Sequence, residues 1–342
     1  MGRSYRCRAH AGRQRSRVHR SSQEDIMSEK NIRIAKDAYD QYDPEREWSR
    51  ASDAPEPAHV SRAVLTRLRA TAVLTTLCVA AALSLLVPAR SDAIIGGELD
   101  GNRHPNVGLI IGCSEGCQVA VACSGTLISP TIVLTAAHCV EFPGLDTFFV
   151  TFDPDPFSGG LPELIQGEAH PHPNFSFDAF TQGQKSFQTL QRFDVAVVEL
   201  EEAPDITPAP LPSENVLEPF TTGGSNQLFT IVGYGSDRDI EPPLGKELLF
   251  DGKRRTTTVP LMKLTDTLIF VRTNPNDAQG GGGGCFGDSG GPIFHGETVV
   301  GEFVAVQAQA SATGSLCQSY GFYVRIDTGP AREFLSQFVT LP

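Results

Sequence analysis

The sequence predicts an all-β fold, either a barrel or a sandwich, for residues 94–342. Short apolar runs typical of strands recur there, at residues 107–111, 126–128, 132–135, 148–152, 195–200, 229–232, 268–271, 299–306 and 322–326. Clusters of proline and glycine, which favour turns, separate these runs. Helical spacing of apolar side chains first occurs at residues 330–338, where Phe334, Leu335 and Phe338 share one face. We therefore expect strands throughout and one terminal helix.

The charge of the chain changes sign near residue 93. Residues 1–93 hold 16 basic and 11 acidic residues, whereas residues 94–342 hold 12 and 29, and the whole chain has a net charge of −12. An acidic domain is repelled by phosphate backbones and anionic membranes, so residues 94–342 are not expected to bind nucleic acid. The basic N-terminus has no aromatic side chains among its arginines apart from Tyr5, so we do not expect nucleic-acid binding there either.

Two segments precede the predicted β domain. Residues 1–69 are predicted to be disordered, because they are charged and hold few large apolar side chains. Residues 70–93 have the features of a secretory signal: an uncharged apolar run at 70–87, arginines before it and small residues before a cleavage point after Ala93. We expect secretion and only transient contact with the membrane. The alternative is that residues 70–87 remain as a membrane anchor.

The position of this signal is unusual. A secretory signal normally occupies the first 30 residues or so, and this one lies beyond residue 60. We therefore expect translation to start downstream of Met1, near Val60 or Val64. On either start, the mature domain would comprise residues 94–342.

Cysteine usage agrees with export. Of eight cysteines, Cys7 and Cys78 fall in the part expected to be removed. An even number in an exported chain favours disulfides over free thiols. A zinc site at Cys113 and Cys117 is the alternative, but no second pair of suitable ligands stands nearby. The six remaining cysteines are Cys113, Cys117, Cys123, Cys139, Cys285 and Cys317.

A candidate catalytic segment lies at residues 285–292 (CFGDSGGP), directly after five consecutive glycines. Glycine permits tight turns, so Ser289 can expose its hydroxyl as a nucleophile. The N–H groups of Gly287 and Ser289 would then form an oxyanion hole. A linker is one alternative, and the nucleophile elbow of α/β-hydrolases is another. The elbow needs an acid and then a histidine downstream, and only His295 follows, so the order excludes it.

The nucleophile needs a base and a group that orients the base. His138, in residues 134–139 (LTAAHC), follows a buried-looking strand and is the candidate base, although a lone histidine can also be structural. Asp194, at the start of residues 194–200 (DVAVVEL), is the candidate acid, because burying a carboxylate is costly unless it is paired. A hydrogen bond from the imidazole would select the tautomer that accepts the serine proton. Glu199 is the rival acid, and a surface role is the alternative for Asp194.

Four motifs occur in the order found in one family. They are IIGG at 94–97, TAAHC at 135–139, DVAV at 194–197 and GDSGGP at 287–292. Residues 94–342 resemble the chymotrypsin/trypsin-like serine peptidases over essentially their whole length. The resemblance implies two six-stranded antiparallel β-barrels with the active site between them and a C-terminal helix. His138 and Asp194 would come from the first barrel and Ser289 from the second, and peptide bonds would be cleaved through an acyl-enzyme.

The resemblance also implies disulfide pairs. Cys123 would bond Cys139, beside the candidate base. Cys285 would bond Cys317 and brace the specificity pocket. Cys113 and Cys117 match nothing in the family pattern, and we expect them to bond each other.

Activation and specificity are implied in the same way. In the family, a newly formed N-terminal ammonium, here that of Ile94, pairs with the acid before the nucleophile, here Asp288, and sets the oxyanion hole. Because Ala93 precedes Ile94, removal of the signal would itself free this ammonium. The pocket floor would be Gly283, six residues before the nucleophile. The floor would then have no carboxylate to bind an arginine or lysine side chain of the substrate.

The pocket walls would be Val306 and Gly321, which predict a small or apolar uncharged residue before the scissile bond. Relatives often carry a serine in the segment that matches residues 304–306, and no serine stands here to support Asp194.

The rival hypothesis is a catalytically inactive relative that only binds partners. We expect no cofactor and no metal. Weak calcium binding by Asp153 and Asp155 is the alternative to a solvated turn there, and the prolines around His170 and His172 predict an extended loop without a third ligand. The expected partners are protein or peptide substrates, and the expected state is a monomer.

Overall fold

The computed structural model describes residues 94–114, 117, 120–160, 162–178, 192–220, 227–236, 238–240, 247–274, 282–308, 317 and 319–342. All of them belong to one of the two compact units of the chain, the unit that contains residues 92–342. The predicted disordered segment, the predicted signal and the five-glycine run up to Gly281 lie outside the described residues. Within those residues, no helix has the length and apolar character needed to cross a membrane.

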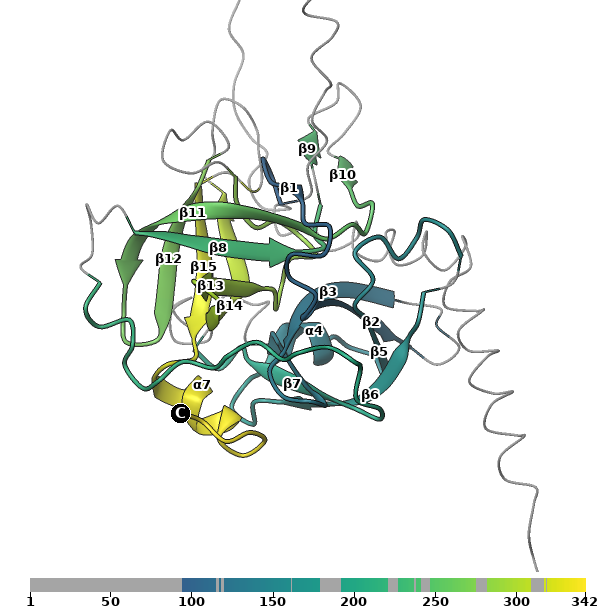
Figure 1. Ribbon diagram of the computed structural model, residues 1–342, viewed down its shortest axis with the longest axis horizontal. Helices are drawn as coiled ribbons and strands as arrows, with labels where there is room; N and C mark the ends of the chain where they lie inside the picture. Colours follow the sequence, from purple (N-terminus) through teal and green to yellow (C-terminus); the bar gives the residue numbers. More distant parts are fainter. Residues whose placement is uncertain are drawn as a thin grey trace, which may run out of the picture. The chain divides into compact units, whose positions relative to one another are not determined.

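The first barrel is closed by six antiparallel strands in the order β2-β3-β4-β7-β6-β5 (Figure 1). Its core forms because most of these strands are apolar runs; β2, for example, is buried at every position. The strands are β2 (Val107–Cys113), β3 (Ala120–Leu127), β4 (Ile132–Thr135), β5 (Thr147–Thr151), β6 (Ile165–Pro171) and β7 (Ala196–Leu200).

The second barrel also has six antiparallel strands, and the pairing of β11 with β8 closes it. Its strands are β8 (Leu228–Gly233), β11 (Arg255–Leu264), β12 (Leu268–Thr273), β13 (Pro292–His295), β14 (Thr298–Ala308) and β15 (Ser319–Arg325). The two-residue β1 (Glu98–Leu99) adds to the edge of β11. β9 (Arg238–Ile240) and β10 (Glu247–Leu249) form a separate ribbon. The prediction of two six-stranded barrels is confirmed.

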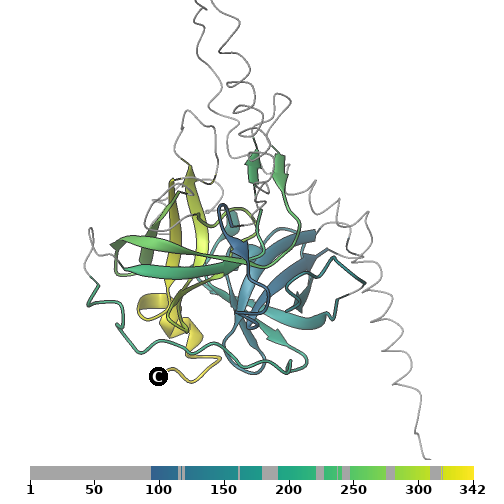
Figure 2. The ribbon, with the colours of Figure 1, turned by 45° about the horizontal axis from the view of Figure 1, so that its top comes forward.

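Two helices matter for the site. α4 (Ala137–Val140) is a single turn after β4, and α7 (Gly329–Leu335) is the predicted terminal helix, which starts one residue earlier and ends sooner than its apolar spacing suggested. Phe334 and Leu335 of α7 are buried. Figures 1 and 2 show the two barrels side by side, with α7 close to the C-terminal end of the chain.

The structure corrects one local prediction. The extended loop expected at His170 is instead the end of β6, where His170 pairs with Val197 and Pro171 with Ala196. β6 was not recognised because its sequence (IQGEAHP) mixes polar and apolar residues, and most of its positions are half-exposed. β11 was not recognised either, since it contains Pro260 and begins with a basic residue, both of which argue against a central strand.

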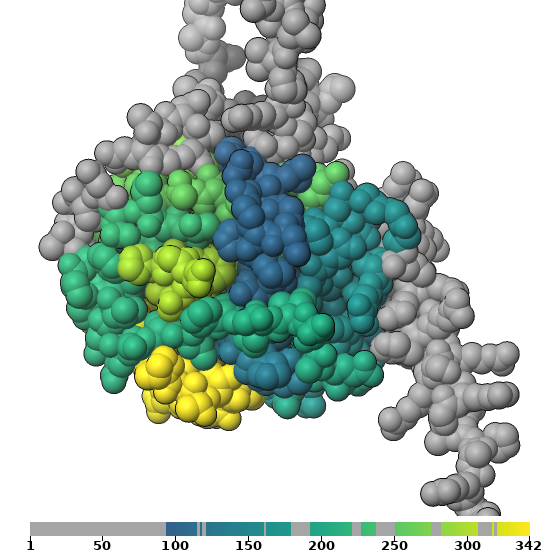
Figure 3. Space-filling view, viewed as in Figure 1, coloured from purple at the N-terminus to yellow at the C-terminus, as the bar shows by residue number. Residues whose placement is uncertain are grey.

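The N-terminal segment bridges the two barrels. In the space-filling view of Figure 3 its residues (dark blue) form a strip between the second barrel (green) and the first barrel (teal). Ile94 is buried in the apolar core of the second barrel. Ile95 exchanges two backbone hydrogen bonds of 3.0 Å with Gly283.

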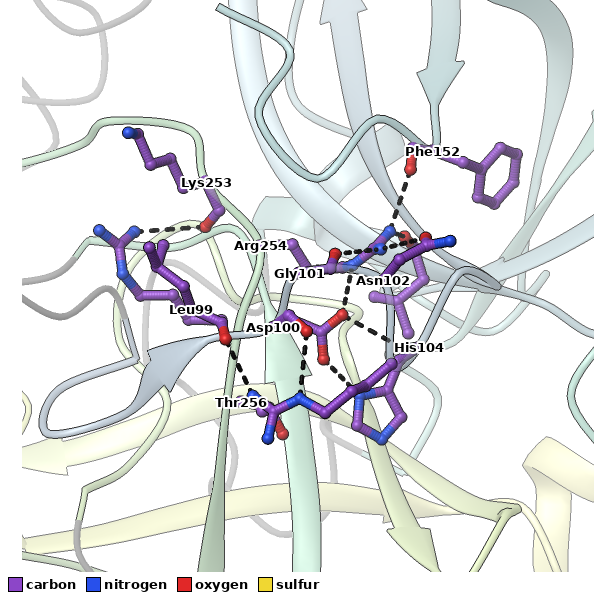
Figure 4. A network of polar contacts seen from close by, with 12 residues as sticks. Leu99, Asp100, Gly101, Asn102, His104, Phe152, Lys253, Arg254 and Thr256 are labelled. Atoms are coloured by element: carbon purple, nitrogen blue, oxygen red, sulfur yellow. Dashed lines mark hydrogen bonds and ion pairs between the residues drawn. The ribbon is translucent and has the colours of Figure 1, made fainter. Parts of the chain in front are cut away.

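A buried arginine anchors this segment (Figure 4). Nε of Arg254 donates to Oδ2 of Asp100 at 2.9 Å, and both side chains are fully buried. The other guanidinium nitrogens donate to the carbonyls of Val107, at 2.8 Å, and Phe152, at 3.0 Å, in the first barrel, and to the carbonyl of Gly101 at 3.0 Å. One guanidinium therefore connects the N-terminal segment, the first barrel and the strand β11.

Replacing Arg254 by methionine should strongly destabilise the fold. The substitution removes the only described cationic donor other than His104 from the fully buried Asp100 carboxylate, and one donor each from the carbonyls of Gly101, Val107 and Phe152. Removing one partner of a buried ion pair costs about 3–5 kcal/mol. The free energy of unfolding from denaturant titration measures the effect.

The neighbouring residue supplies a matched control. Lys253 forms an ion pair with Asp155 at 3.2 Å, and both side chains are about a third exposed. Its replacement by methionine should cost less than about 1 kcal/mol, because water screens such pairs. Equal losses for the two variants would show that the buried network does not anchor the segment.

Candidate active site

The pairing of two neighbouring strands brings the candidate base and acid together. β4 and β7 are antiparallel, and Thr135 at the end of β4 lies opposite Ala196 at the start of β7. His138 follows Thr135 after a short step into α4, and Asp194 precedes Ala196. The two side chains therefore emerge at the same end of the first barrel.

Both carboxylate oxygens of Asp194 contact His138. Oδ2 lies 2.8 Å from Nδ1 of the imidazole, and Oδ1 accepts a 2.8 Å hydrogen bond from the backbone N–H of His138. Asp194 is fully buried, whereas 17% of the His138 side chain is exposed. With Nδ1 donating to the carboxylate, Nε2 is the ring nitrogen that can accept a proton. The sequence-predicted base and acid thus form an oriented pair.

Tight turns hold Ser289 at the start of the second barrel's strand β13. Gly287 and Gly290 have φ angles of 92° and 76°, which side-chain-bearing residues rarely adopt. Asp288 and Gly290 are buried, but Ser289 between them is partly exposed. In the described part of the chain, the N–H groups of Gly287 and Ser289 donate to no other group. Two unused donors beside an accessible hydroxyl suit an oxyanion.

Ser124 connects the nucleophile loop to the first barrel. Its N–H donates to the carbonyl of Ser289 at 2.8 Å, and its hydroxyl donates to the carbonyl of Gly287 at 2.9 Å. The Sγ atom of Cys139 lies 3.8 Å from the same Ser289 carbonyl. The main chain of Ser289 therefore lies beside the residue that follows His138. Among the described contacts, no hydrogen bond joins the Ser289 hydroxyl to the imidazole.

Asp288 is buried behind the nucleophile. Its Oδ1 accepts from the N–H of Gly235 and its Oδ2 from the N–H of Cys285, each at 2.8 Å. Burial outweighs these two bonds and raises the pKa of the Asp288 carboxyl to about 7. A Cβ on Gly235 would lie 2.5 Å from this carboxyl, so the close approach requires glycine. Both of its described hydrogen bonds come from backbone N–H groups, and the charge of Arg255 is the last and smallest of the effects that lower its pKa.

The predicted pocket residues lie together and are backed by an aromatic ring. Val306 and Gly321 are cross-strand partners on β14 and β15. A Cβ on Gly283 would lie 2.3 Å from Thr273, and one on Gly321 would lie 3.5 Å from the ring of Phe303. Phe303 is buried, and the sequence analysis did not single it out. These contacts leave little room behind the glycines.

The three predicted disulfides are present, between Cys113 and Cys117, Cys123 and Cys139, and Cys285 and Cys317. The sulfur atoms of the second pair and a ring nitrogen of His138 lie within 4.8 Å of one another. Both sulfurs are bonded to each other, so no thiolate is left to hold a metal. This cluster therefore does not fit a metal site.

One buried acid was missed by sequence reasoning. Glu302, in the apolar run of β14, is fully buried. Burial raises its pKa well above the usual value, and the charge of Asp194 raises it further. A lone acid inside an apolar strand was the available signal.

Comparisons with known proteins agree with this architecture. A family model described as Trypsin matches residues 101–329. Brachyurin from Leptuca pugilator is 30% identical over 176 residues, which cover 50% of this chain and 70% of that protein. Among solved structures, HL collagenase superposes with a TM-score of 0.52 at 19% identity, covering 72% of this chain and 100% of its own. Human heparin binding protein gives 0.51 at 18% identity, covering 73% and 99%. At such identities the solved structures establish the fold alone.

Proposed function

Because the chain belongs to the trypsin family of serine peptidases, we propose that it is an endopeptidase that uses Ser289, His138 and Asp194. The observation that carries this proposal is the His138–Asp194 pair, formed beside the loop of an accessible serine. The signal-like segment predicted at residues 70–93 of this chain further favours secretion. The proposed partners are protein or peptide substrates.

The proposed reaction follows from the orientation of these groups. Nε2 of His138 takes the proton of Ser289 as Oγ attacks the peptide carbonyl carbon. The resulting oxyanion accepts hydrogen bonds from the N–H groups of Gly287 and Ser289. His138 then gives its proton to the departing amine, which leaves an acyl-enzyme. Water, deprotonated by His138, releases the acid and restores Ser289.

The environment of Asp288 supports activation by a new N-terminus. A buried carboxylate without a cationic partner is unfavourable, and the segment that begins at Ile94 already bonds Gly283 in the same loop region. Ile94 has a φ of 47°, which strains a β-branched residue. Cleavage before Ile94 removes this dihedral constraint and creates the ammonium that Asp288 lacks. We propose that removal of the signal performs this step.

The pocket supports a preference for small uncharged side chains. Gly283 offers no carboxylate to a basic substrate side chain, and a Cβ at this position would collide with Thr273. The Phe303 ring lies 3.0 Å from the position of a Cβ on Gly284 and 3.5 Å from one on Gly321. The ring therefore fills the space that a long side chain before the scissile bond would need.

A fluorophosphonate should label the wild-type protein at Ser289, and Ser289→Ala should abolish labelling. His138→Ala should lower kcat by about 10⁴- to 10⁶-fold, since the triad acts as a unit. Mass spectrometry and peptide p-nitroanilide hydrolysis measure these effects. Ser336→Ala, at an exposed serine after α7, is the matched control and should keep full labelling. An unlabelled wild type would instead favour an inactive, partner-binding relative.

The stability of the uncleaved chain should fall as pH rises from about 4 to about 7. The folded pKa of Asp288, about 7, exceeds its usual 3.8, so in this window the folded state binds a proton that the unfolded state has lost. The slope for one proton is at most about 1.4 kcal/mol per pH unit. Denaturant titrations of the wild type and Asp288→Asn, both carrying Ser289→Ala against self-digestion, isolate this slope.

A chain beginning at Ile94 provides the comparison. Its ammonium should lower the pKa of Asp288 and so remove most of the slope between pH 4 and 7. Identical slopes in the cleaved and uncleaved chains would contradict pairing between Ile94 and Asp288.

Phe303→Val should widen the pocket. The ratio of kcat/KM for a phenylalanine substrate to that for an alanine substrate should rise at least about tenfold, the scale of one or two methylenes in an apolar pocket. Phe270→Val is the control, because Phe270 lies on the opposite face of β12 from Val271 and Thr273, where it contacts Phe322. The control should leave the ratio unchanged. A wild type that prefers arginine or lysine would refute the pocket assignment.

A further inference from the structure

Ser124 carries a fully buried hydroxyl group between the two barrels. This hydroxyl accepts a 2.9 Å hydrogen bond from the N–H of Tyr234 and donates a 2.9 Å hydrogen bond to the carbonyl of Gly287. Because the N–H of Tyr234 can only donate, the hydroxyl proton points to Gly287. The two contacts therefore fix the direction of the hydroxyl, with its donor side on the nucleophile loop.

Gly287 needs support from its surroundings. Its φ of 92° lies in a region that glycine both enters and leaves easily. Its N–H is one of the two donors proposed for the oxyanion, and rotation about the backbone bonds of Gly287 would turn this N–H away from the substrate. An oxyanion hole is most effective when its donors are already oriented before the reaction, because no reorganisation is then needed in the transition state.

Both peptide groups that flank Gly287 are held through their carbonyls. The group before it is held by Ser236, whose N–H donates to the carbonyl of Phe286 at 2.7 Å. In a trans peptide the N–H points away from the carbonyl, so this bond directs the N–H of Gly287 away from Ser236. The group after it is held by the Ser124 hydroxyl. Holding both groups fixes φ and ψ of Gly287 together.

Ser124 also holds the residue that supplies the second oxyanion donor. Its backbone N–H donates to the carbonyl of Ser289 at 2.8 Å. A Cβ on Gly290 would lie 2.4 Å from the carbonyl oxygen of Ser124, so the loop packs directly against the main chain of this residue. Ser124 thus bonds to Gly287 through its side chain and to Ser289 through its backbone.

We propose that the hydroxyl of Ser124 is a positioning group for the oxyanion hole: it holds Gly287 so that its N–H faces the substrate carbonyl together with the N–H of Ser289. The inference rests on the proposed peptidase function and deepens it at the same site. Ser124 makes no contact with substrate in this role, since it acts through Gly287. The first barrel then supplies the base and the acid and also orients a donor of the second barrel.

Two substitutions and one control separate this role from general support of the fold. Ser124→Ala removes the hydroxyl, whereas Ser124→Thr keeps it. Thr256→Val is the matched control, because the hydroxyl of Thr256 is also buried and donates to a backbone carbonyl, that of Ile231, at 2.9 Å within the second barrel. Each variant is expressed as the full chain and assayed on an alanine p-nitroanilide peptide. Circular dichroism at the assay temperature gives the folded fraction.

The alanine variant should lose kcat by about 10- to 100-fold per folded molecule, with little change in KM, because the oxyanion forms only after the substrate has bound. This loss is smaller than for deletion of an oxyanion donor, since the N–H of Gly287 is still present. Ser124→Thr should recover most of the lost kcat. Thr256→Val should lower the midpoint of denaturant unfolding, as Ser124→Ala does, but keep the wild-type kcat.

A spectroscopic measurement reports the oxyanion hole without turnover. A cinnamoyl group is transferred to Ser289, and the infrared stretch of its acyl carbonyl is recorded. Hydrogen bonds from the oxyanion hole lower this frequency because they polarise the carbonyl. The band should move to higher frequency in Ser124→Ala and stay at the wild-type frequency in Ser124→Thr and Thr256→Val.

Two outcomes with a folded alanine variant overturn the inference. The first is a wild-type kcat together with an unshifted carbonyl band. The second is an equal loss of kcat in Ser124→Ala and Thr256→Val, which would leave Ser124 a structural role only.

If the alanine variant does not fold, Ser124→Thr decides. An unshifted band in the threonine variant supports the hydroxyl as the positioning group. A shifted band despite the retained hydroxyl would show that packing at position 124 orients Gly287 instead, and so overturns the inference. A wild type that hydrolyses no peptide and reacts with neither the fluorophosphonate nor the cinnamoyl reagent refutes the proposed function rather than this role of Ser124.

Discussion

The hydrogen bonds of Ser124 are the constraint on which the arrangement of the site depends. This fully buried side chain on β3 of the first barrel donates to Gly287, while its N–H donates to Ser289 of the second barrel. Its hydroxyl also accepts from the N–H of Tyr234 at 2.9 Å. The apolar core of the first barrel continues into residues of the second, such as Leu268, Val299 and Val324, and the chemistry needs groups from both barrels. Ser124 fixes the nucleophile loop relative to the strand whose Cys123 is bonded to Cys139, and thus relative to His138.

Asp194, Asp288 and Glu302 are buried in this part of the molecule, and their carboxyl groups differ in how many hydrogen bonds they accept. Asp194 accepts two hydrogen bonds from His138. Its negative charge can therefore stabilise the imidazolium that forms when His138 takes a proton. Asp288 accepts two backbone hydrogen bonds and still has a raised pKa. Glu302 accepts none. Burial raises the pKa of the Asp288 carboxyl to about 7 and the pKa of the Glu302 carboxyl well above its usual value.

Much of the architecture could be predicted because the strands of the barrels are short apolar runs, and because four motifs occur in one order. Local sequence could not reveal β11, whose Pro260 and preceding basic residues are typical of a surface loop. It also could not show that Arg254 is buried, since its partners come from segments far away in the chain. The burial of Glu302 was missed for the same reason, because it depends on the pairing of β14 with both β13 and β15.

The anchoring of Asp100 by Arg254 has a consequence for the end of the chain that cleavage before Ile94 would create. The residues between Ile94 and Asp100 then act as a short tether, and even fully extended they reach only about 20 Å. A freed amine on such a tether searches a small volume around Asp288, so its effective concentration there is high and docking costs little entropy. Because the segment is short, the amine also cannot reach the more distant carboxylates of this acidic domain.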